Sequence, residues 1–364
     1  MARTGITGAA ADEIWEKLQG FAAFGFPESH SVSFAYIVYM SAWLKYHWPA
    51  EFLAGLLNAQ PMGFYSPNSL VQDARRHGVV VLSPDVNESE YDATVVPHPS
   101  DPDDLATYLG ASWRRGRGAR DDPVRMAVAV RMGLRSVRNL GESEIGRIEA
   151  ARQVGGPFSS VVDLAQRSGL PVVALEGLAA SGALQPLGVE RREALWTAGG
   201  LAGMGPGRLA ISEVGEAPDL PPLSDADQTR LDLWSTGVSV RHPAEFVRDR
   251  LAALGCLPIS RILSEPARAR RVRVGGIVTH RQRPMTANGV IFLNLEDETG
   301  LLNVIVLPGV WDEHREVARR SVGVVLDGVL EHRDGVTNLV ARRFSSWSDE
   351  IEGIGSRDWG RGGR

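Results

Sequence analysis

The longest nearly continuous hydrophobic run covers residues 32–44, where only Ser33 and Ser41 are polar. A helix that is apolar on every side is normally buried, and this run is shorter than the ~20 residues that span a bilayer. The pattern therefore predicts a core helix, entered through a polar loop at residues 25–31. A serine of that loop is expected to cap the helix, and Pro49 suits the first turn of the next helix, which runs to Asn58.

The residues around this run resemble a known protein family. The text GFPESHSVSFAYIVYMSAWLKYHWPAEFLAGLLNAQPMGFYSP, residues 25–67, is similar to the fingers region of the bacterial C-family DNA polymerases, the alpha subunit of DNA polymerase III. Pro27-Glu28 and the segment 60–67 resemble the error-prone, damage-induced branch, the ImuC type. In this family the matching part of the fingers faces the incoming nucleotide. The resemblance therefore implies that Ser29, His30 and Ser31 lie on the nucleotide side of the fingers.

The following segment alternates between regular patterns and turn-rich text. Residues 69–77 predict a helix and residues 79–82 a buried strand, with Gly78 between them. Residues 97–122 are rich in turn formers and charges, which predicts a loop or insert. Four arginines cluster in that loop, and a solvated loop is favoured over DNA contact for them: Arg114, Arg115, Arg117 and Arg120.

Residues 137–148 resemble a helix-hairpin-helix, after a strand predicted by the alternation in 126–137. In such a hairpin a tight Gly-x-Gly turn directs backbone N–H groups at the next helix toward a phosphate. Here Asn139 replaces the first glycine, and asparagine tolerates the left-handed conformation. Two roles stay open for Asn139, Gly141 and Ser143: contact with the DNA backbone, or a purely structural turn. A second helical pair at 171–182 lacks such a hairpin and is interpreted as packing.

The C-terminal third has the pattern of a β-barrel. One helix is expected at 310–320, between the third and fourth of five strands, which fits an OB-fold. The expected strands cover 272–278, 289–295, 301–307, 322–330 and 336–341. The text at 276–283 and 292–297 resembles the nucleic-acid-binding OB domain of the same polymerases. Phe292 is a candidate for base stacking or for the core, and Arg281 and Arg283 beside the first hairpin are candidate DNA contacts.

These patterns predict a multidomain chain of mixed α and β class, with a helical fingers end, a helix-hairpin-helix domain and a C-terminal OB-fold barrel. The expected division is 1–96 for the end of the fingers, 97–125 for a charged loop, 126–200 for the helix-hairpin-helix domain, 201–266 for a linker with short helices, 267–345 for the OB domain and 346–364 for a polar tail.

Composition limits the setting of this protein. The 364 residues carry a net charge of −5, so any nucleic-acid contact must come from local patches. The single Cys256 excludes an intrachain disulfide and fits a reducing cytosol. Neither a secretory signal nor a membrane span is recognisable, which predicts a cytoplasmic location.

Candidate catalytic groups are weak. Nucleotidyl transfer uses two metal ions held by carboxylates. The acidic runs at 101–104 and 296–298 are interpreted as turns, and no phosphate-cradling glycine loop occurs. We therefore predict no catalytic residue, no metal site and no bound cofactor in this chain. By resemblance, the catalytic palm and a PHP domain are expected to precede the matching region, which already begins at residues 1–20.

The resemblance implies the C-terminal portion of an error-prone, DNA-directed DNA polymerase, a nucleotidyltransferase for damage-induced mutagenesis and lesion bypass. The intact enzyme is expected to use Mg²⁺ and deoxynucleoside triphosphates, whereas this chain alone is expected to be inactive. Expected partners are single-stranded template and primer-template DNA, with inactive Y-family-like and RecA-like accessory proteins and, indirectly, the sliding clamp. The alternative is a non-enzymatic single-stranded DNA-binding module or an inactive fragment. A palm encoded upstream would favour the first reading.

Overall fold

The computed structural model describes residues 7–23, 28–63, 65–97, 128–201, 217–264, 270–333 and 335–350. It divides into two compact units, residues 1–49 and 50–364. The expected loop at 97–122, its four arginines, and most of the polar tail fall almost entirely outside the described residues. Their interpretation stays a prediction.

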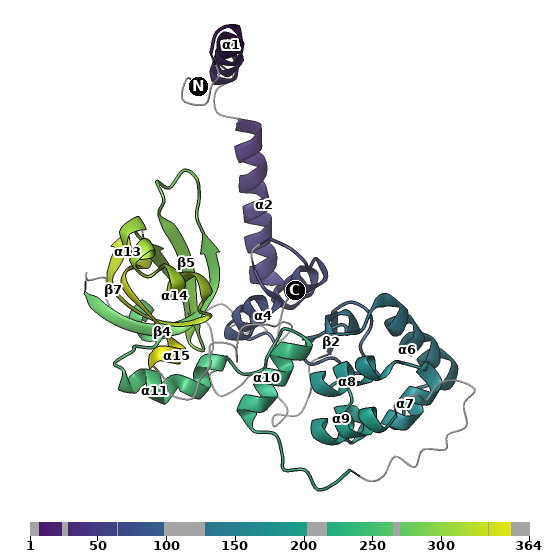
Figure 1. The fold of residues 1–364 in the computed structure, drawn as a ribbon. Coiled ribbons are helices and arrows are strands. Elements are labelled where there is room, and N and C mark those ends of the chain that lie inside the picture. The colour runs from purple at the N-terminus through teal and green to yellow at the C-terminus, as the bar shows by residue number, and fades with distance from the viewer. Residues whose placement is uncertain are drawn as a thin grey trace. The chain divides into compact units, whose positions relative to one another are not determined.

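The first unit consists of α1 (Ala9–Ala23) and the long helix α2 (Glu28–His47), which is plain in Figure 1. The prediction that the apolar run is buried on every side is wrong for this structure. Tyr36 is 66% exposed and Tyr39 68%, and the neighbouring apolar side chains are exposed as well. The run does favour a helix, but burial needs a second surface against the side chains, and a helix cannot supply that surface itself.

The division falls after the first residue of α3 (Pro49–Asn58), and the second unit continues with α4 (Pro67–Arg76) and a small sheet. Ser66 caps α4 by accepting a hydrogen bond from the Ser69 N–H at 3.2 Å, and Pro67 occupies the first turn. The sheet has the order β1 (Val81–Leu82), β3 (Val128–Arg131), β2 (Thr94–Pro97). β3 is parallel to β1 and antiparallel to β2. Strands are present within both expected segments, 79–82 and 126–137, but they are shorter than expected, since Leu134–Ser136 is a 3-10 helix; β2 is an addition.

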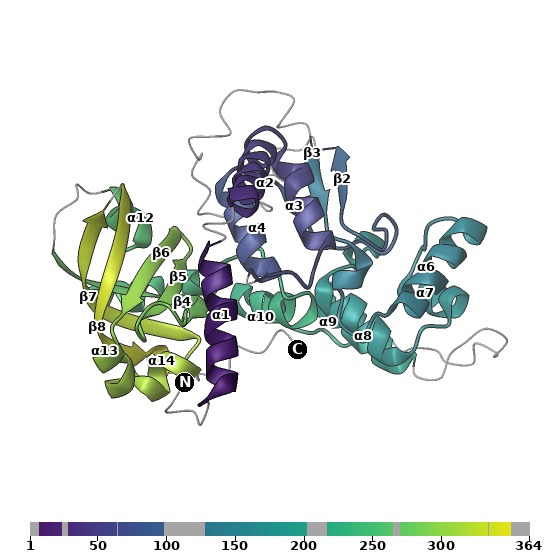
Figure 2. The same ribbon diagram turned by 90° about the horizontal axis from the view of Figure 1, so that it is seen from above.

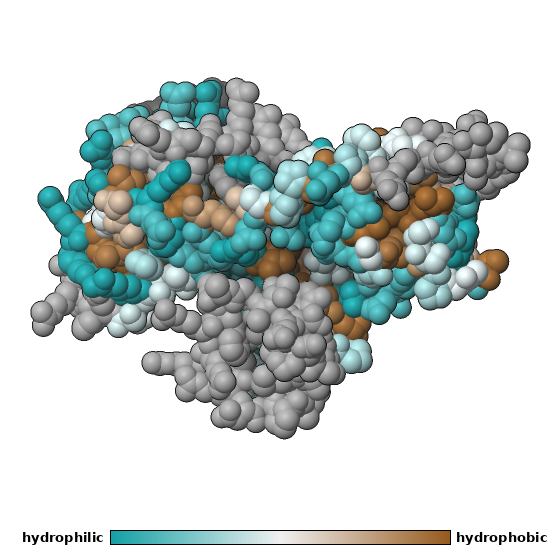
Figure 3. All heavy atoms as spheres, turned by 90° about the horizontal axis from the view of Figure 1, so that it is seen from below, coloured by the Kyte–Doolittle hydropathy of each residue, from teal (hydrophilic) through white to brown (hydrophobic). Residues whose placement is uncertain are grey.

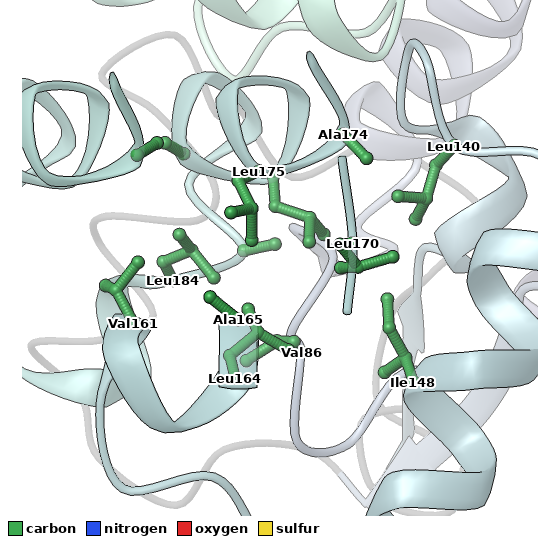
Figure 4. Close-up of a cluster of buried hydrophobic side chains, with 14 of the residues drawn as sticks. Val86, Leu140, Ile148, Val161, Leu164, Ala165, Leu170, Ala174, Leu175 and Leu184 are labelled. Carbon is green, nitrogen blue, oxygen red and sulfur yellow. The ribbon is translucent and has the colours of Figure 1, made fainter. Parts of the chain in front are cut away.

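A helical domain follows β3. It contains the short 3-10 helix η2 (Leu134–Ser136), α6 (Glu142–Gly155), α7 (Val161–Ser168), α8 (Val172–Ser181), η3 (Gln185–Leu187) and α9 (Arg191–Gly200). The views in Figures 1 and 2 agree that α6, α7, α8 and α9 are gathered together. Figure 4 shows Ile148, Leu164 and Leu175 directed into one shared cluster of buried side chains. Helix α8 therefore supplies core packing, with Leu175 and Leu178 buried.

Short helices connect this domain to the barrel: α10 (Asp225–Ser235), η4 (Pro243–Val247), α11 (Arg248–Ala253) and α12 (Ile259–Ser264). Arg191 on α9 donates to Asp232 on α10 at 2.6 Å, and both side chains are buried. Burial raises the Asp232 pKa, although Arg191 opposes the shift. Arg75 of α4 is also buried and donates to the carbonyls of Ser239 and Val240. These contacts hold the connector against its neighbours.

The C-terminal barrel confirms the OB-fold prediction. Its strands are β4 (Arg271–Gln282), β5 (Ile291–Asp297), β6 (Gly300–Val306), β7 (Gly323–Arg333) and β8 (Val336–Ser346). They close in the order β4-β5-β6-β8-β7, with β6 and β8 parallel. The single helix expected at 310–320 is two short helices, α13 (Pro308–Glu313) and α14 (Arg315–Arg320). The short α15 (Trp347–Glu350) follows β8, and the Trp347 indole donates to the Val324 carbonyl.

The described surface is mixed in character. On the face drawn in Figure 3, hydrophilic residues predominate and hydrophobic ones form separate patches. In the ranges that the structure covers, no helix has both the length and the apolar character needed to cross a membrane.

Candidate nucleic-acid interface

The barrel presents an uncharged outer surface on β5 and β6. Successive side chains of a strand point to opposite faces, and Leu293 and Val304 pair across the strands and point into the core. The residues immediately before and after each of these two therefore point outward. The register pairs Phe292 with Ile305 and Asn294 with Asn303. We call Phe292, Asn294, Asn303 and Ile305 the β5–β6 outer face.

The chemistry of this face suits single-stranded nucleic acid. Phe292 is 40% exposed, so its ring can accept a stacked base. The two asparagine amides offer both donors and acceptors. Arg283, exposed at the start of the hairpin that joins β4 to β5, adds a positive charge beside the face. None of the four side chains of the face carries a charge that would repel phosphate.

The same surface is closed at its other end. Glu296 is two residues beyond Asn294 on β5 and is buried, with Arg76 donating to its carboxylate at 2.8 Å and Ser69 at 3.4 Å. Burial raises the Glu296 pKa, and the positive charge of Arg76 opposes the shift. Helix α4 thus covers this part of β5, and the outer face stays open toward the β4–β5 hairpin.

Arg281 has a structural arrangement in this barrel. Its guanidinium donates to the Ala318 carbonyl at 2.9 Å and also to the Ser321 carbonyl, at the end of α14. Desolvation lowers the Arg281 pKa. A β-bulge between Val278 and His280 shifts the register, so Arg281 pairs with the inward-pointing Leu293. The guanidinium is thus held by two carbonyls at the end of α14, and this arrangement favours a structural role for Arg281 over the DNA contact expected from the sequence.

The acidic run 296–298 forms a turn and an anchor. Asp297 accepts from the N–H groups of Thr299 and Gly300, at 2.8 and 3.0 Å, which closes the turn between β5 and β6. Arg248 donates to Asp297 at 2.8 Å and to Glu298 at 2.7 Å. Because Arg76 also pairs with Glu296, each of the three carboxylates already has an arginine as its partner. Across the described part of the chain, no three His, Cys, Asp or Glu side chains are grouped so as to hold a metal ion.

The helical hairpin keeps its tight turn. Asn139 has a φ of 62°, the left-handed conformation that the sequence led us to expect. The Gly141 N–H, however, donates to the Glu144 carboxylate at 3.2 Å. Glu142 and Glu144 both lie in the first turn of α6, and Ser143 is exposed between them. Two carboxylates at a helix N-terminus favour the helix but repel a phosphate, so this geometry favours the structural role of the turn.

Ser29, His30 and Ser31 lie in the first turns of α2, which begins at Glu28, so the expectation that these three residues belong to a loop is wrong. The His30 ring makes an edge contact with Phe34 at 4.5 Å between centroids, one helical turn away. The nucleotide-side role of the three residues stays a prediction.

Comparison with known proteins shows which families this chain is similar to. The family model described as "Helix-hairpin-helix motif" matches residues 78–194. The error-prone DNA polymerase of Corynebacterium efficiens is 45% identical over 364 residues, which covers 99% of this chain and 30% of that protein. The chain is homologous to part of the error-prone DNA polymerases. The Nocardia farcinica and Mycobacterium tuberculosis error-prone DNA polymerases are 45% and 44% identical, over 97% and 96% of this chain.

The chain spans about 30% of the length of these error-prone polymerase relatives. Among solved structures, the asparaginyl-tRNA synthetase of Pyrococcus horikoshii is similar over 23% of this chain and 21% of that one, at 17% identity and a TM-score of 0.21. That score is too low to carry an argument.

Sequence reasoning missed three residues of the interface. Asn294, Asn303 and Ile305 stand at alternate positions of two strands, and that period of two, counted from Phe292, was the signal available. Tyr65 had no such signal. Its ring lies against His280 of β4, with the centroids 5.0 Å apart.

Proposed function

We propose that this chain binds single-stranded DNA on the β5–β6 outer face, as part of a polymerase for error-prone, template-directed DNA synthesis past lesions. The observation that carries the proposal is the strand register, which puts an exposed Phe292 and two amides on one uncharged surface beside Arg283. The homology to error-prone DNA polymerases over 99% of the chain supports it. The matched helix-hairpin-helix model covers residues 78–194, outside this face, and supports only the general assignment to a DNA-binding protein.

A binding assay tests the surface directly. Fluorescence anisotropy with a labelled oligo-dT strand would measure the affinity of the chain and of Phe292→Ala. Base stacking on an aromatic side chain contributes ~1–3 kcal/mol, so we expect the Kd of the variant to be about tenfold higher. Trp196→Ala is the matched control, because Trp196 is an aromatic residue of α9 with 52% of its surface exposed. Equal affinities for Phe292→Ala and the unchanged chain would contradict the proposal.

The polymerase reaction belongs to the intact enzyme in this proposal. We propose that a palm outside this chain uses Mg²⁺ and deoxynucleoside triphosphates. We also propose that the inactive Y-family-like and RecA-like accessory proteins and, indirectly, the sliding clamp act with the intact enzyme. The chain alone should give no primer extension with Mg²⁺ and all four nucleotides. Extension above a control without protein would refute this assignment.

A second experiment separates a polymerase part from an independent DNA-binding module. Phe292→Ala would be introduced into the intact polymerase and tested on undamaged and lesion-containing templates. A polymerase part should lose extension rate or processivity together with DNA affinity. Loss of affinity with unchanged extension would favour the independent module.

A further inference from the structure

A residue far away in the sequence borders the β5–β6 outer face. Tyr65 lies in the segment between α3 and α4, and its ring is tilted by 39° over the ring of His280 on β4. His280 is only 9% exposed, whereas 49% of the Tyr65 surface remains exposed. Tyr65 therefore contacts His280 and still presents aromatic surface to solvent.

The strand register places this pair next to the outer face. His280 pairs with Asn294, and Gln282 pairs with Phe292. His280 and Phe292 are therefore diagonal neighbours on one face, and residues in this relation are usually about 7–8 Å apart. The Tyr65 ring, which contacts His280, therefore lies close to the Asn294 end of this face.

The side chains between Phe292 and the Tyr65–His280 pair are amides. Asn294 lies beside His280 and the exposed Gln282 beside Phe292. The buried Glu296, on the same side of β5, is paired with Arg76 and does not present an open carboxylate. An aromatic ring at each end of an uncharged amide strip suits a run of bases, because each ring can stack on a base and each amide can bond to a base edge.

We propose that Tyr65 is a second base-stacking residue, and that single-stranded DNA runs from Phe292 across Asn294 to Tyr65. This inference rests on the proposed function of the β5–β6 outer face and adds a contact from outside the barrel. The strand then leaves the barrel at the segment between α3 and α4. The OB domain and the polymerase segment before it thus bind one continuous piece of template.

Three substitutions of Tyr65 distinguish stacking from packing. Tyr65→Phe keeps the ring, Tyr65→Leu keeps an apolar contact with His280 without a ring, and Tyr65→Ala removes both. With a labelled oligo-dT strand, we expect near-normal affinity for the Phe variant and about tenfold weaker affinity for the Leu and Ala variants. We expect the melting temperature of the Leu variant to stay close to that of the unchanged chain. If Tyr65 only covers His280, the Leu variant should bind DNA normally, and the inference is overturned.

Photocrosslinking gives an independent readout of contact. An oligonucleotide in which thymidines are replaced by 5-iododeoxyuridine crosslinks to aromatic residues that stack on the modified base. We expect crosslinked peptides that contain Tyr65 and Phe292, and none that contain the exposed control Trp196. Crosslinks at Phe292 without any at Tyr65, together with normal affinity of Tyr65→Ala, would overturn the inference and leave the proposed function standing. No binding by the unchanged chain would refute the proposed function itself.

Discussion

The Arg76 guanidinium on α4 donates to the buried Glu296 carboxylate on β5 at a distance of 2.8 Å. Glu296 also accepts from Ser69 on the same helix. The next two residues, Asp297 and Glu298, accept from Arg248 at the start of α11. One short acidic run therefore attaches the barrel to two helices, and it holds the covered end of β5 in place beside the open outer face.

Removing Arg76 should strongly destabilise this attachment. Arg76→Ala leaves the Glu296 carboxylate buried without its cation, a change that typically costs ~3–5 kcal/mol. Urea unfolding would measure the loss. Arg320→Ala is the control, since the Arg320–Glu316 pair is exposed and such pairs contribute ~0–1 kcal/mol. Glu296→Gln should destabilise less than Arg76→Ala, because the amide carries no buried charge. Equal stability of Arg76→Ala and the unchanged chain would show that the pair does not hold the barrel.

The two arginines that flank the β4–β5 hairpin should respond differently to substitution. Arg281→Ala should lower stability by about 1–3 kcal/mol, because the carbonyls of Ala318 and Ser321 lose their donor. Its DNA affinity, per folded molecule, should change little. Arg283→Ala should keep stability but weaken oligo-dT binding and reduce the salt slope by about 0.7 for each lost phosphate contact. Thermal melting and anisotropy over a salt series would check both variants. The reverse assignment of effects would contradict this division of roles.

The hairpin turn should tolerate glycine better than alanine at position 139. Asn139 has a φ of 62°, a conformation that costs most residues with a Cβ ~1–2 kcal/mol. Asn139→Ala should therefore be destabilising by about 1 kcal/mol, whereas Asn139→Gly should be close to neutral. Chemical denaturation of the two variants would decide. Equal losses for both would mean that the asparagine side chain, and not its backbone conformation, stabilises the turn.

A buried histidine should make stability depend on pH. His242 accepts a hydrogen bond from the Ala244 N–H through Nδ1, and burial, with Arg76 and Arg248 nearby, lowers its pKa to about 3. In the unfolded chain the pKa is ~6.5. Below that pH only the unfolded state binds the proton, so stability is complete above pH ~6.5 and falls as the pH drops toward 3.

The limiting slope for this single group is about 1.36 kcal/mol per pH unit. Denaturation between pH 7 and 5 would measure it, above the range in which most carboxylates titrate. His242→Asn keeps a side chain suited to the helix start and does not titrate, so its stability should vary less across that range. The same pH dependence in both proteins would show that His242 is not its source.

His30 can be tested in the intact polymerase. The side chain is exposed on α2, so His30→Ala should leave the melting temperature nearly unchanged. Loss of a nucleotide contact should raise KM for nucleotides or lower kcat. Phe34→Ala is the matched variant, because it removes the ring that His30 contacts without removing the histidine. Normal kinetics per folded molecule for His30→Ala would end the nucleotide-side assignment.

Much of this architecture follows from the sequence alone. Strands of the barrel show the period of two, so the alternation of Val272, Val274 and Val278 predicted a strand, and the structure places these valines in the barrel core. The left-handed Asn139 was also predictable, because a local turn depends on the residue that occupies it. Both are local properties, set by neighbours in the chain.

Tertiary structure decided the rest. The bulge in β4 turned Arg281 toward carbonyls of α14, and no local pattern reports which carbonyls will lie within reach. The 66% exposure of Tyr36 shows that a hydrophobic run specifies a helix but not the surface that would cover it. The sequence predicted only a turn for Glu296. Its ion pair with Arg76, and the contact of Tyr65 with His280, exist only in the folded chain. Such contacts join residues far apart in sequence, so only the packing of one element on another determines them.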